Sequence, residues 1–275
     1  MYGVVTRNEE ELDWSEFDRA FYEVKDVTGR AAEPVPEGIS MISCFGDNAA
    51  ADGNPDLVPV SEDGELATRD RQYFDWDYVC PTREDYREGL LEIVEDAAEV
   101  NPDVRLDDVG FPRPEYCHCD RCERRFAESE FDDWFAWRAD VITEFVREAR
   151  ERVPGDLYLT LYPDPYPGHI HERAGLDIDA LAESVDEFVV PIYDMAYTTT
   201  YWLEIIASGF EDALDVPFSV ELYAVDVDID NLIDAAEVAG EYGESVLFGY
   251  DASNARATLR RMNADGREGE EFGAS

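Results

Sequence analysis

The sequence predicts an α/β fold in which eight parallel strands, each followed by a helix, close into one (β/α)8 barrel, a TIM barrel. Short β-rich runs alternate with helical patterns, as in a parallel sheet that helices cover. The chain has 275 residues, a normal length for one such barrel, and 45% of them are hydrophobic, enough for a large core. We expect a single domain over residues 1–262 and a polar, disordered tail over residues 263–275.

Seven segments have the composition of short strands. An eighth strand is expected in the stretch 46–81, near Tyr73–Val79, because this stretch is too long for an ordinary loop. Otherwise the stretch is functional, and in either case the barrel is irregular there. The seven segments are Tyr2–Thr6, Ile39–Cys44, Val104–Val109, Leu157–Tyr162, Phe188–Asp194, Phe218–Tyr223 and Val246–Tyr250.

Helical periodicity occupies most of the segments between these strands. A barrel of this kind carries its function at the C-terminal ends of its strands, so the residues that follow each strand are the candidates for chemistry. The predicted helices are Ser15–Val24, Arg83–Val100, Phe131–Val153, Ile178–Ser184, Trp202–Leu214 and Ile229–Tyr242.

Acidic residues dominate the charge of the chain. The 66 Asp and Glu against 22 Lys and Arg give a net charge of -44, and Lys25 is the only lysine. Such a surface repels itself at low ionic strength, and molar salt, with a Debye length of ~3 Å, removes the repulsion. We therefore expect a halophilic, archaeal protein. The charge also argues against nucleic acid and anionic membranes as partners, since no basic patch is visible.

The sequence also indicates a cytoplasmic protein. No apolar run approaches the ~20 residues that span a bilayer, and Met1–Arg7 lacks the pattern of a signal peptide. In a cytoplasmic chain, five cysteines suggest a metal site or free thiols rather than disulfides. Whether the chain forms a homo-oligomer is left open.

Three of these cysteines, Cys117, Cys119 and Cys122, lie within six positions. A structural zinc ion takes four ligands in a tetrahedron, so a fourth ligand is needed. Cys80 is the best candidate, because it lies in the preceding β/α unit and neighbouring units are adjacent in a barrel. His118 is a less suitable alternative, and three unrelated loop thiols are the alternative to a metal site. We expect a structural Zn²⁺ on the four cysteines, whose closed coordination leaves no position for a catalytic water.

A longer motif surrounds these cysteines. It reads Asp75-Trp-Asp-Tyr-Val-Cys80-Pro-x(4)-Tyr86-Arg87, continues with an acidic strand end and Tyr116-Cys-x-Cys-x-x-Cys-x-x-x-Phe126, and ends with Trp134. This order resembles the family 42 β-galactosidases, and looser groups of glycoside-hydrolase-like barrels, over residues 75–140. In that family an upstream cysteine and a CxCxxC triple bind a structural zinc.

The resemblance implies a glycoside hydrolase whose acid/base ends strand 4 and whose nucleophile ends strand 7. If Tyr73–Val79 is strand 3, strand 7 carries Glu221 at the nucleophile position. Strand 4 then ends in Asp107-Asp108, where the family has Asn-Glu. Because Asp is one methylene shorter than Glu, this departure leaves the acid role and the specificity for galactose open.

The residues themselves support two carboxyl groups in the barrel mouth, as glycoside hydrolysis requires. Glu221 shares a strand face with Ser219 and Tyr223, opposite an apolar face that packs on helices. Strict alternation places Asp107 in the lumen, whereas the resemblance favours Asp108. We keep both and favour Asp108, because strand ends often bulge. With 66 acids, a solvated surface position is the ordinary alternative for each.

Aromatic and polar residues at other strand ends suit a carbohydrate, because tyrosine and tryptophan combine an apolar face with a polar tip. The alternatives to a hydrolase are a carbohydrate-binding barrel that has lost its acid/base and, third, a zinc or thiol protein. Gly-rich phosphate loops, Gly-x-Ser-x-Gly and His-Glu-x-x-His are absent from the sequence. The predicted substrate-binding residues are Trp76, Tyr162, Tyr193, Asp194, Tyr223 and Asp251.

Overall fold

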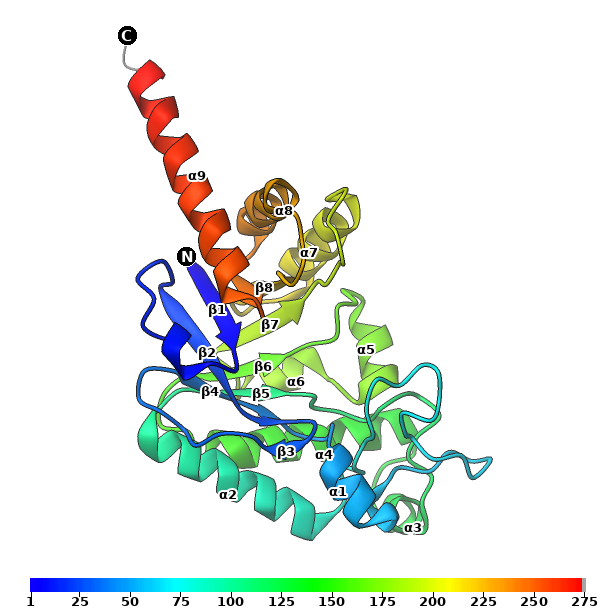
Figure 1. The fold of residues 1–275 in the computed structure, drawn as a ribbon. Coiled ribbons are helices and arrows are strands. Elements are labelled where there is room, and N and C mark those ends of the chain that lie inside the picture. The colour runs from blue at the N-terminus through cyan, green and yellow to red at the C-terminus, as the bar shows by residue number, and fades with distance from the viewer. Residues whose placement is uncertain (274–275) are drawn as a thin grey trace.

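A computed structural model of the chain describes residues 1–273, with side chains described as far as residue 264. Eight parallel strands close into a barrel, because β1 pairs with both β2 and β9 (Figure 1). The short β3 (Gly29–Arg30) pairs antiparallel with β2 at the barrel rim. The predicted (β/α)8 fold is therefore confirmed. The barrel strands are β1 (Tyr2–Thr6), β2 (Arg19–Asp26), β4 (Ile39–Ser43), β5 (Val104–Asp107), β6 (Leu157–Thr160), β7 (Glu187–Pro191), β8 (Phe218–Tyr223) and β9 (Ser245–Gly249).

The strand that the sequence analysis missed is β2. The predicted helix Ser15–Val24 is wrong, and so is the predicted strand near Tyr73–Val79, where the structure has only an isolated bridge at Tyr78. The charged residues of β2 favoured the solvent face of a helix. In the fold, Arg19, Glu23 and Lys25 instead form ion pairs, and the side chains of Glu23 and Lys25 are buried.

This correction does not alter the numbering of the later strands. Because β2 supplies the missing strand before β4, β5 is the fourth barrel strand and β8 is the seventh. Asp107 and Glu221 thus lie on the fourth and seventh barrel strands, as expected, although the expectation rested on the wrong third strand.

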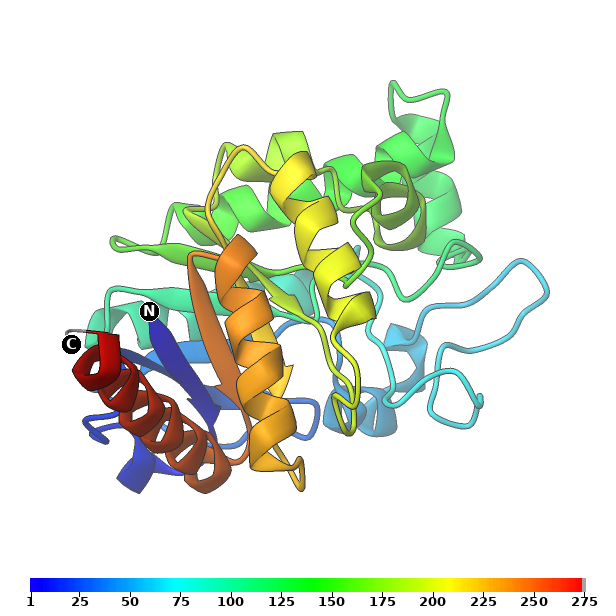
Figure 2. The ribbon, with the colours of Figure 1, turned by 90° about the horizontal axis from the view of Figure 1, so that it is seen from above.

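Helices cover the outside of the barrel (Figure 2). Five of the six predicted helices correspond to α2, α4, α6, α7 and α8. Helix α9 continues to Gly273 and so runs through most of the segment 263–275; residues 274 and 275 of the predicted tail lie outside the described residues. None of the helices within residues 1–273 has the length and apolar character needed to cross a bilayer. The helices are α1 (Asn48–Gly53), α2 (Glu84–Val100), α3 (Asp120–Glu128), α4 (Trp134–Arg150), α5 (Pro167–Ala174), α6 (Ile178–Ala182), α7 (Tyr201–Ala213), α8 (Ile229–Tyr242) and α9 (Ala252–Gly273), with short 3-10 turns at Glu9–Glu11 and Pro55–Leu57.

The N-terminal end of the barrel is filled. Arg19 donates to Glu187 at 2.9 Å and to Ser219 at 2.7 Å. Above this cluster, Phe21 and Tyr158 meet edge to face with their ring centroids 5.2 Å apart. Polar pairs and aromatic rings thus occupy this end, and in a barrel of this kind ligands bind at the C-terminal ends of the strands.

Candidate functional site

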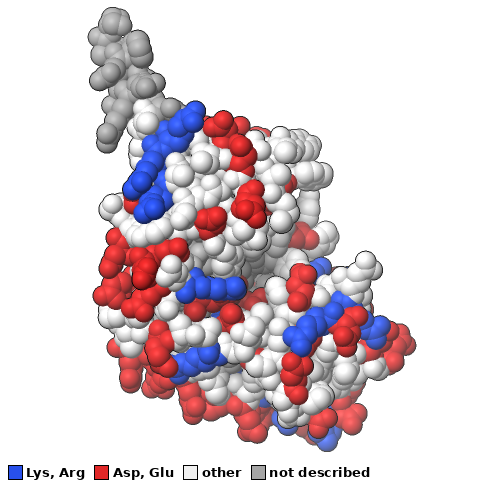
Figure 3. Space-filling model, viewed as in Figure 1, with Lys and Arg blue, Asp and Glu red and all other residues white. Residues whose placement is uncertain are grey.

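A cavity of ≈ 530 Å³ opens at the C-terminal ends of the strands. The surface in Figure 3 is hollowed in this way, with acidic and basic side chains around the hollow. Its floor carries Asp107 and Asp108, and aromatic side chains line its sides. A volume of this size is typical of small-ligand sites. The aromatic lining residues are Tyr73, Phe74, Trp76, Tyr78, Phe111, Tyr162, Tyr193 and Tyr250.

Asp107 and Asp108 both line the cavity although they are consecutive. Strand β5 ends at Asp107, and Asp108 has a φ of 50°, in the left-handed region that non-glycine residues rarely occupy. This departure from the strand conformation turns both carboxyl groups to the same side. The structure therefore accommodates both alternatives that the sequence left open, and it stores backbone strain at the cavity, as functional sites often do.

The surroundings of Asp108 favour the protonated form of its carboxyl group. The Ser43 hydroxyl donates a hydrogen bond to its Oδ2 at 2.5 Å. Burial, followed by the negative charge of Asp107, raises the pKa of Asp108 to about 7, although Ser43 and Lys25 act in the opposite direction. A carboxyl group with this pKa is about half protonated at neutral pH, and its protonated form can donate to a leaving group.

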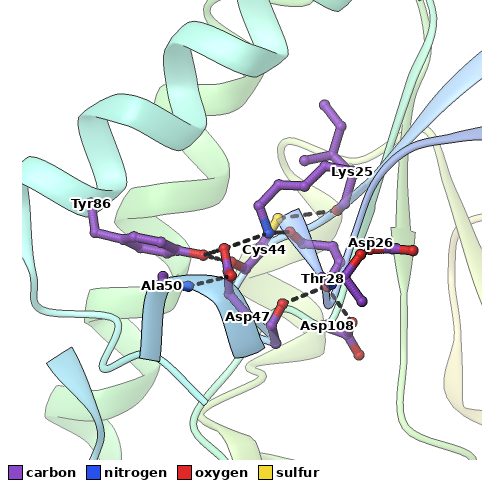
Figure 4. A network of polar contacts seen from close by, with 11 residues as sticks. Lys25, Asp26, Thr28, Cys44, Asp47, Ala50, Tyr86 and Asp108 are labelled. Atoms are coloured by element: carbon purple, nitrogen blue, oxygen red, sulfur yellow. Dashed lines mark hydrogen bonds and ion pairs between the residues drawn. The ribbon is translucent and has the colours of Figure 1, made fainter. Parts of the chain in front are cut away.

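A buried polar network supports the segment that contacts Asp108 (Figure 4). The Lys25 ammonium lies 3.0 Å from the Asp47 carboxylate and donates to the Ser43 carbonyl at 2.7 Å. The Tyr86 hydroxyl lies 2.9 Å from the same carboxylate and 2.8 Å from the Cys44 carbonyl. Because these groups are buried and mutually bonded, they fix the segment 43–47, including the Ser43 hydroxyl, against Asp108.

Glu221 faces the barrel interior, as alternation predicts, but it is 0% exposed. Its Oε2 lies 2.6 Å from Nη2 of Arg105, and its Oε1 accepts a hydrogen bond from the Tyr193 hydroxyl. Burial and the charge of Glu221 raise the pKa of Tyr193, so this hydroxyl remains a donor. Arg105 and Tyr193 line the cavity, whereas Glu221 lies behind them.

The predicted binding residues divide into two groups. Trp76, Tyr162 and Tyr193 line the cavity, and Tyr223 packs against Tyr193 with its centroid 5.5 Å away. The two aspartates serve the backbone instead. Asp194 accepts from the amide nitrogens of residues 196 and 197, and Asp251 accepts from that of residue 254 at the start of α9.

Five charged lining residues were not among the predicted site residues, namely Arg7, Glu23, Asp75, Arg105 and Arg173. Glu23 was missed because β2 was read as a helix. Arg7 directly follows the correctly predicted strand β1, so its position at a strand end was a usable signal. Arg173 belongs to α5, which lies in a segment where no helix was predicted. No signal in the sequence indicates the position of this side chain.

The four predicted metal ligands come together. The Sγ atoms of Cys80, Cys117, Cys119 and Cys122 all lie within 4.8 Å of one another. Tetrahedral ligands with a Zn–S bond of about 2.3 Å would lie about 3.8 Å apart, so the set fits one ion. The alternative ligand His118 instead stacks on Trp134 with centroids 4.6 Å apart. The cluster can therefore hold a metal ion.

The cluster also joins two loops that line the cavity. Cys80 lies near the end of the long segment between β4 and α2 that carries Trp76 and Tyr78, and the other three cysteines follow the cavity-lining residues 109–112. The amide of Val60 donates to the Cys117 sulfur at 3.4 Å, a further contact between these loops. A bound ion would thus fix the loops that carry the aromatic side of the cavity. The ion itself would lie at some distance from the carboxyl groups of Asp107 and Asp108.

Comparison with known proteins shows that this chain shares its fold with solved structures. No model of a protein family matches the sequence, and no curated protein matches it. Alpha-L-fucosidase isoenzyme 2 from Paenibacillus thiaminolyticus matches 94% of this chain with a TM-score of 0.63 and 12% identity. The match covers 47% of the fucosidase, so the chain spans about half the length of that enzyme. An alpha-amylase from Lactobacillus plantarum matches 91% of this chain and 70% of its own, with a TM-score of 0.46 and 12% identity.

At this level of identity the fucosidase shows the fold that the two proteins share. Membership of family 42 and a halophilic, archaeal or cytoplasmic origin stay predictions from the sequence.

Proposed function

We propose that the protein is a glycoside hydrolase that cleaves an O-glycosidic bond in its barrel mouth. The observation that carries the proposal is the pair of carboxyl groups in an aromatic-lined cavity, one with a pKa raised to about 7 by burial and by its neighbour. Glycoside hydrolysis uses two carboxyl groups, one of which must carry a proton at the working pH. The substrate would be a carbohydrate.

Asp108 would act as the general acid, since it combines the raised pKa with a place in the cavity. Asp107, which also lines the cavity, would supply the second carboxyl group, as nucleophile or as base for water. Glu221 was predicted as the nucleophile from the resemblance. Its enclosure by Arg105 and Tyr193 favours a role in holding these two side chains, unless a substrate displaces Tyr193.

The metal in this proposal is Zn²⁺, bound by Cys80, Cys117, Cys119 and Cys122. Thiolates are soft ligands that suit zinc, and a set of four leaves no open coordination position. The ion would therefore serve stability. Its place in the reaction would be indirect, through the position of the loops that line the cavity.

One observation favours a second function, a barrel that binds carbohydrate without cleaving it. The carboxylate of Glu221, on the seventh barrel strand β8, is fully buried and paired with Arg105. It therefore does not reach the cavity in this structure. If Asp107 also fails to act, the aromatic cavity remains as a binding site.

The test is hydrolysis of a panel of aryl glycosides and oligosaccharides by the wild type and by Asp107→Asn, Asp108→Asn and Glu221→Gln. Loss of a general acid or nucleophile is expected to lower kcat by ~10²–10⁴-fold. Glu99→Gln, an exposed acid on α2, is the control and should keep full activity. Restoration of Asp107→Gly or Glu221→Gly by azide would identify the nucleophile. Sugar binding without hydrolysis of any substrate would replace the hydrolase by the binding barrel.

A further inference from the structure

We infer that Arg173 and Tyr162 form a docking site for an anionic substituent, the carboxylate of a uronic acid, on the sugar that enters the cavity. The inference names a substrate class for the proposed hydrolase and so rests on that proposal. The binding that it describes can nevertheless be measured without any turnover.

The first argument is the charge balance of the cavity. Three arginines line it, Arg7, Arg105 and Arg173. Arg7 forms an ion pair with Glu23, and Arg105 forms one with Glu221 at 2.6 Å. Within the described part of the chain, Arg173 forms no ion pair with a carboxylate. In a chain with 66 acidic residues and 22 basic ones, an arginine that faces a cavity without such a partner has its charge available for a ligand.

The second argument is the geometry of the guanidinium group. It lies over the Tyr162 ring, 4.0 Å from the centroid, and its Nη2 donates to the Tyr162 hydroxyl at 2.5 Å. The Nε of Arg173 is buried and has no hydrogen-bond partner among the described residues. A buried donor without a partner is unfavourable, and the planar guanidinium group matches the two oxygens of a carboxylate. A uronate in the cavity would pair with the charged guanidinium group as a whole, because the Nε itself is covered by protein in this structure.

The third argument is the rigidity of this arginine's backbone. Arg138, which is 0% exposed, donates to the carbonyl oxygens of Glu172 at 2.7 Å and Arg173 at 3.0 Å. The amide of Phe111 donates to the Ala174 carbonyl at 2.9 Å. The end of α5 is thus fixed to the loop that follows Asp107 and Asp108 at the end of β5. A site held in this way binds at a smaller entropic cost than a mobile one.

Asp75, an exposed residue of the cavity lining, forms no ion pair with Arg173 among the described residues, and the other acids of the cavity do not cancel this site. The charge of Glu23 is offset by Arg7. Asp108 is about half protonated at neutral pH, because burial and Asp107 raise its pKa to about 7, so it carries only part of a negative charge there. Asp107 lies close enough to Arg105 for their charges to interact. The charge of Arg173 is therefore the one on the cavity lining that a ligand is free to neutralise.

The experiment is calorimetric titration of the wild type with free glucuronate and galacturonate, each against its neutral sugar, at one pH near 7 and one salt concentration. A charge-assisted pair should make at least one uronate bind ~10–100-fold more tightly than its neutral counterpart. Arg173→Gln should abolish this difference, and Arg173→Lys should keep part of it. Arg256→Gln is the matched control, because Arg256 also stacks on an aromatic ring, Trp14, at 3.7 Å but lies outside the cavity.

Equal binding of neutral and acidic sugars by the wild type, or no binding of any acidic sugar, would overturn the inference. A preference that persists in Arg173→Gln would overturn it as well, since another residue would then hold the anion. If Arg173→Gln does not fold, Arg173→Lys decides instead: a preference smaller than that of the wild type supports the inference, and an unchanged preference overturns it. Binding of a sugar sulfate that depends on Arg173, without binding of uronates, would also overturn the inference, because the ligand would then be a sulfate ester and not a carboxylate. Uronate binding without hydrolysis of any glycoside would refute the proposed function alone.

Discussion

Replacement of Asp108 by Asn should stabilise the protein above neutral pH. The carboxyl group has its pKa raised from 3.8 to about 7 in the fold, because burial and the charge of Asp107 disfavour ionisation. Folding therefore favours the protonated form. The fold is progressively destabilised as pH rises from the unfolded pKa near 3.8 to the folded value near 7, and the full loss persists above that.

The magnitude follows from the shift. A difference of roughly three pKa units at 1.36 kcal/mol each gives about 4 kcal/mol. Asp108 is only half-buried, so water reduces this value, and we expect about 2–4 kcal/mol. Asn also tolerates the left-handed conformation of this position, a contribution that does not depend on pH. The quantity to compare is therefore the change in stability between two pH values.

Urea unfolding of wild type and Asp108→Asn at pH 4.5 and pH 8 measures this quantity at constant salt. The variant should gain about 2–4 kcal/mol over the wild type at pH 8 relative to pH 4.5. The exposed Glu99→Gln on α2 changes the net charge by the same amount and should show no such gain. If Asp108→Asn changes stability equally at both pH values, the raised pKa and the acid role derived from it are refuted.

Further outcomes test the same site and its support. Ser43→Ala removes a hydrogen bond to the Asp108 carboxylate, so the alkaline limb of kcat/KM should move up by about one pH unit; an unmoved limb would contradict this. Removal of the proposed zinc ion by a chelator, or Cys80→Ser, should lower Tm by roughly 5–15 °C, while Cys44→Ser should keep the zinc content of the wild type. Glu221→Leu leaves Arg105 buried without its partner and should destabilise the fold by about 3–5 kcal/mol in urea. Lowering salt to ~0.01 M should lower Tm, because the net charge of -44 is then screened only beyond ~30 Å.

The parts of the fold that the sequence predicted are those with one apolar face. Strand β8 and helix α8 place apolar residues on the side that packs, so period alone identifies them. Strand β2 breaks this rule because its charges lie inside the protein. Glu23 is 6% exposed and Lys25 is 3% exposed, and each is paired with a charge that comes from another segment. Local pattern cannot show such pairs, since they exist only after the barrel closes.

The candidate site was predictable where it depends on residue spacing and strand order. Spacing and strand order brought Cys80 to the other three cysteines, and the end of β5 indicated two carboxyl groups. The enclosure of Glu221 was not predictable, because alternation gives the direction of a side chain but not its depth. Arg105, two positions before Asp107 on β5, fills the space between Glu221 and the cavity.

The strain at the cavity and the cross-links around it have a common explanation. Asp108 and Tyr250 line the cavity with φ values of 50° and 70°, and each such conformation costs about 1–3 kcal/mol. The buried carboxyl group of Asp108 adds a further cost above neutral pH. The proposed metal ion on the four cysteines and the pair of Lys25 with Asp47, both outside the cavity, would offset these costs. Loss of either should therefore unfold the loops around the cavity before the strands of the barrel, and hydrogen exchange of residues 43–47 and 111–122 in Cys80→Ser would show that order.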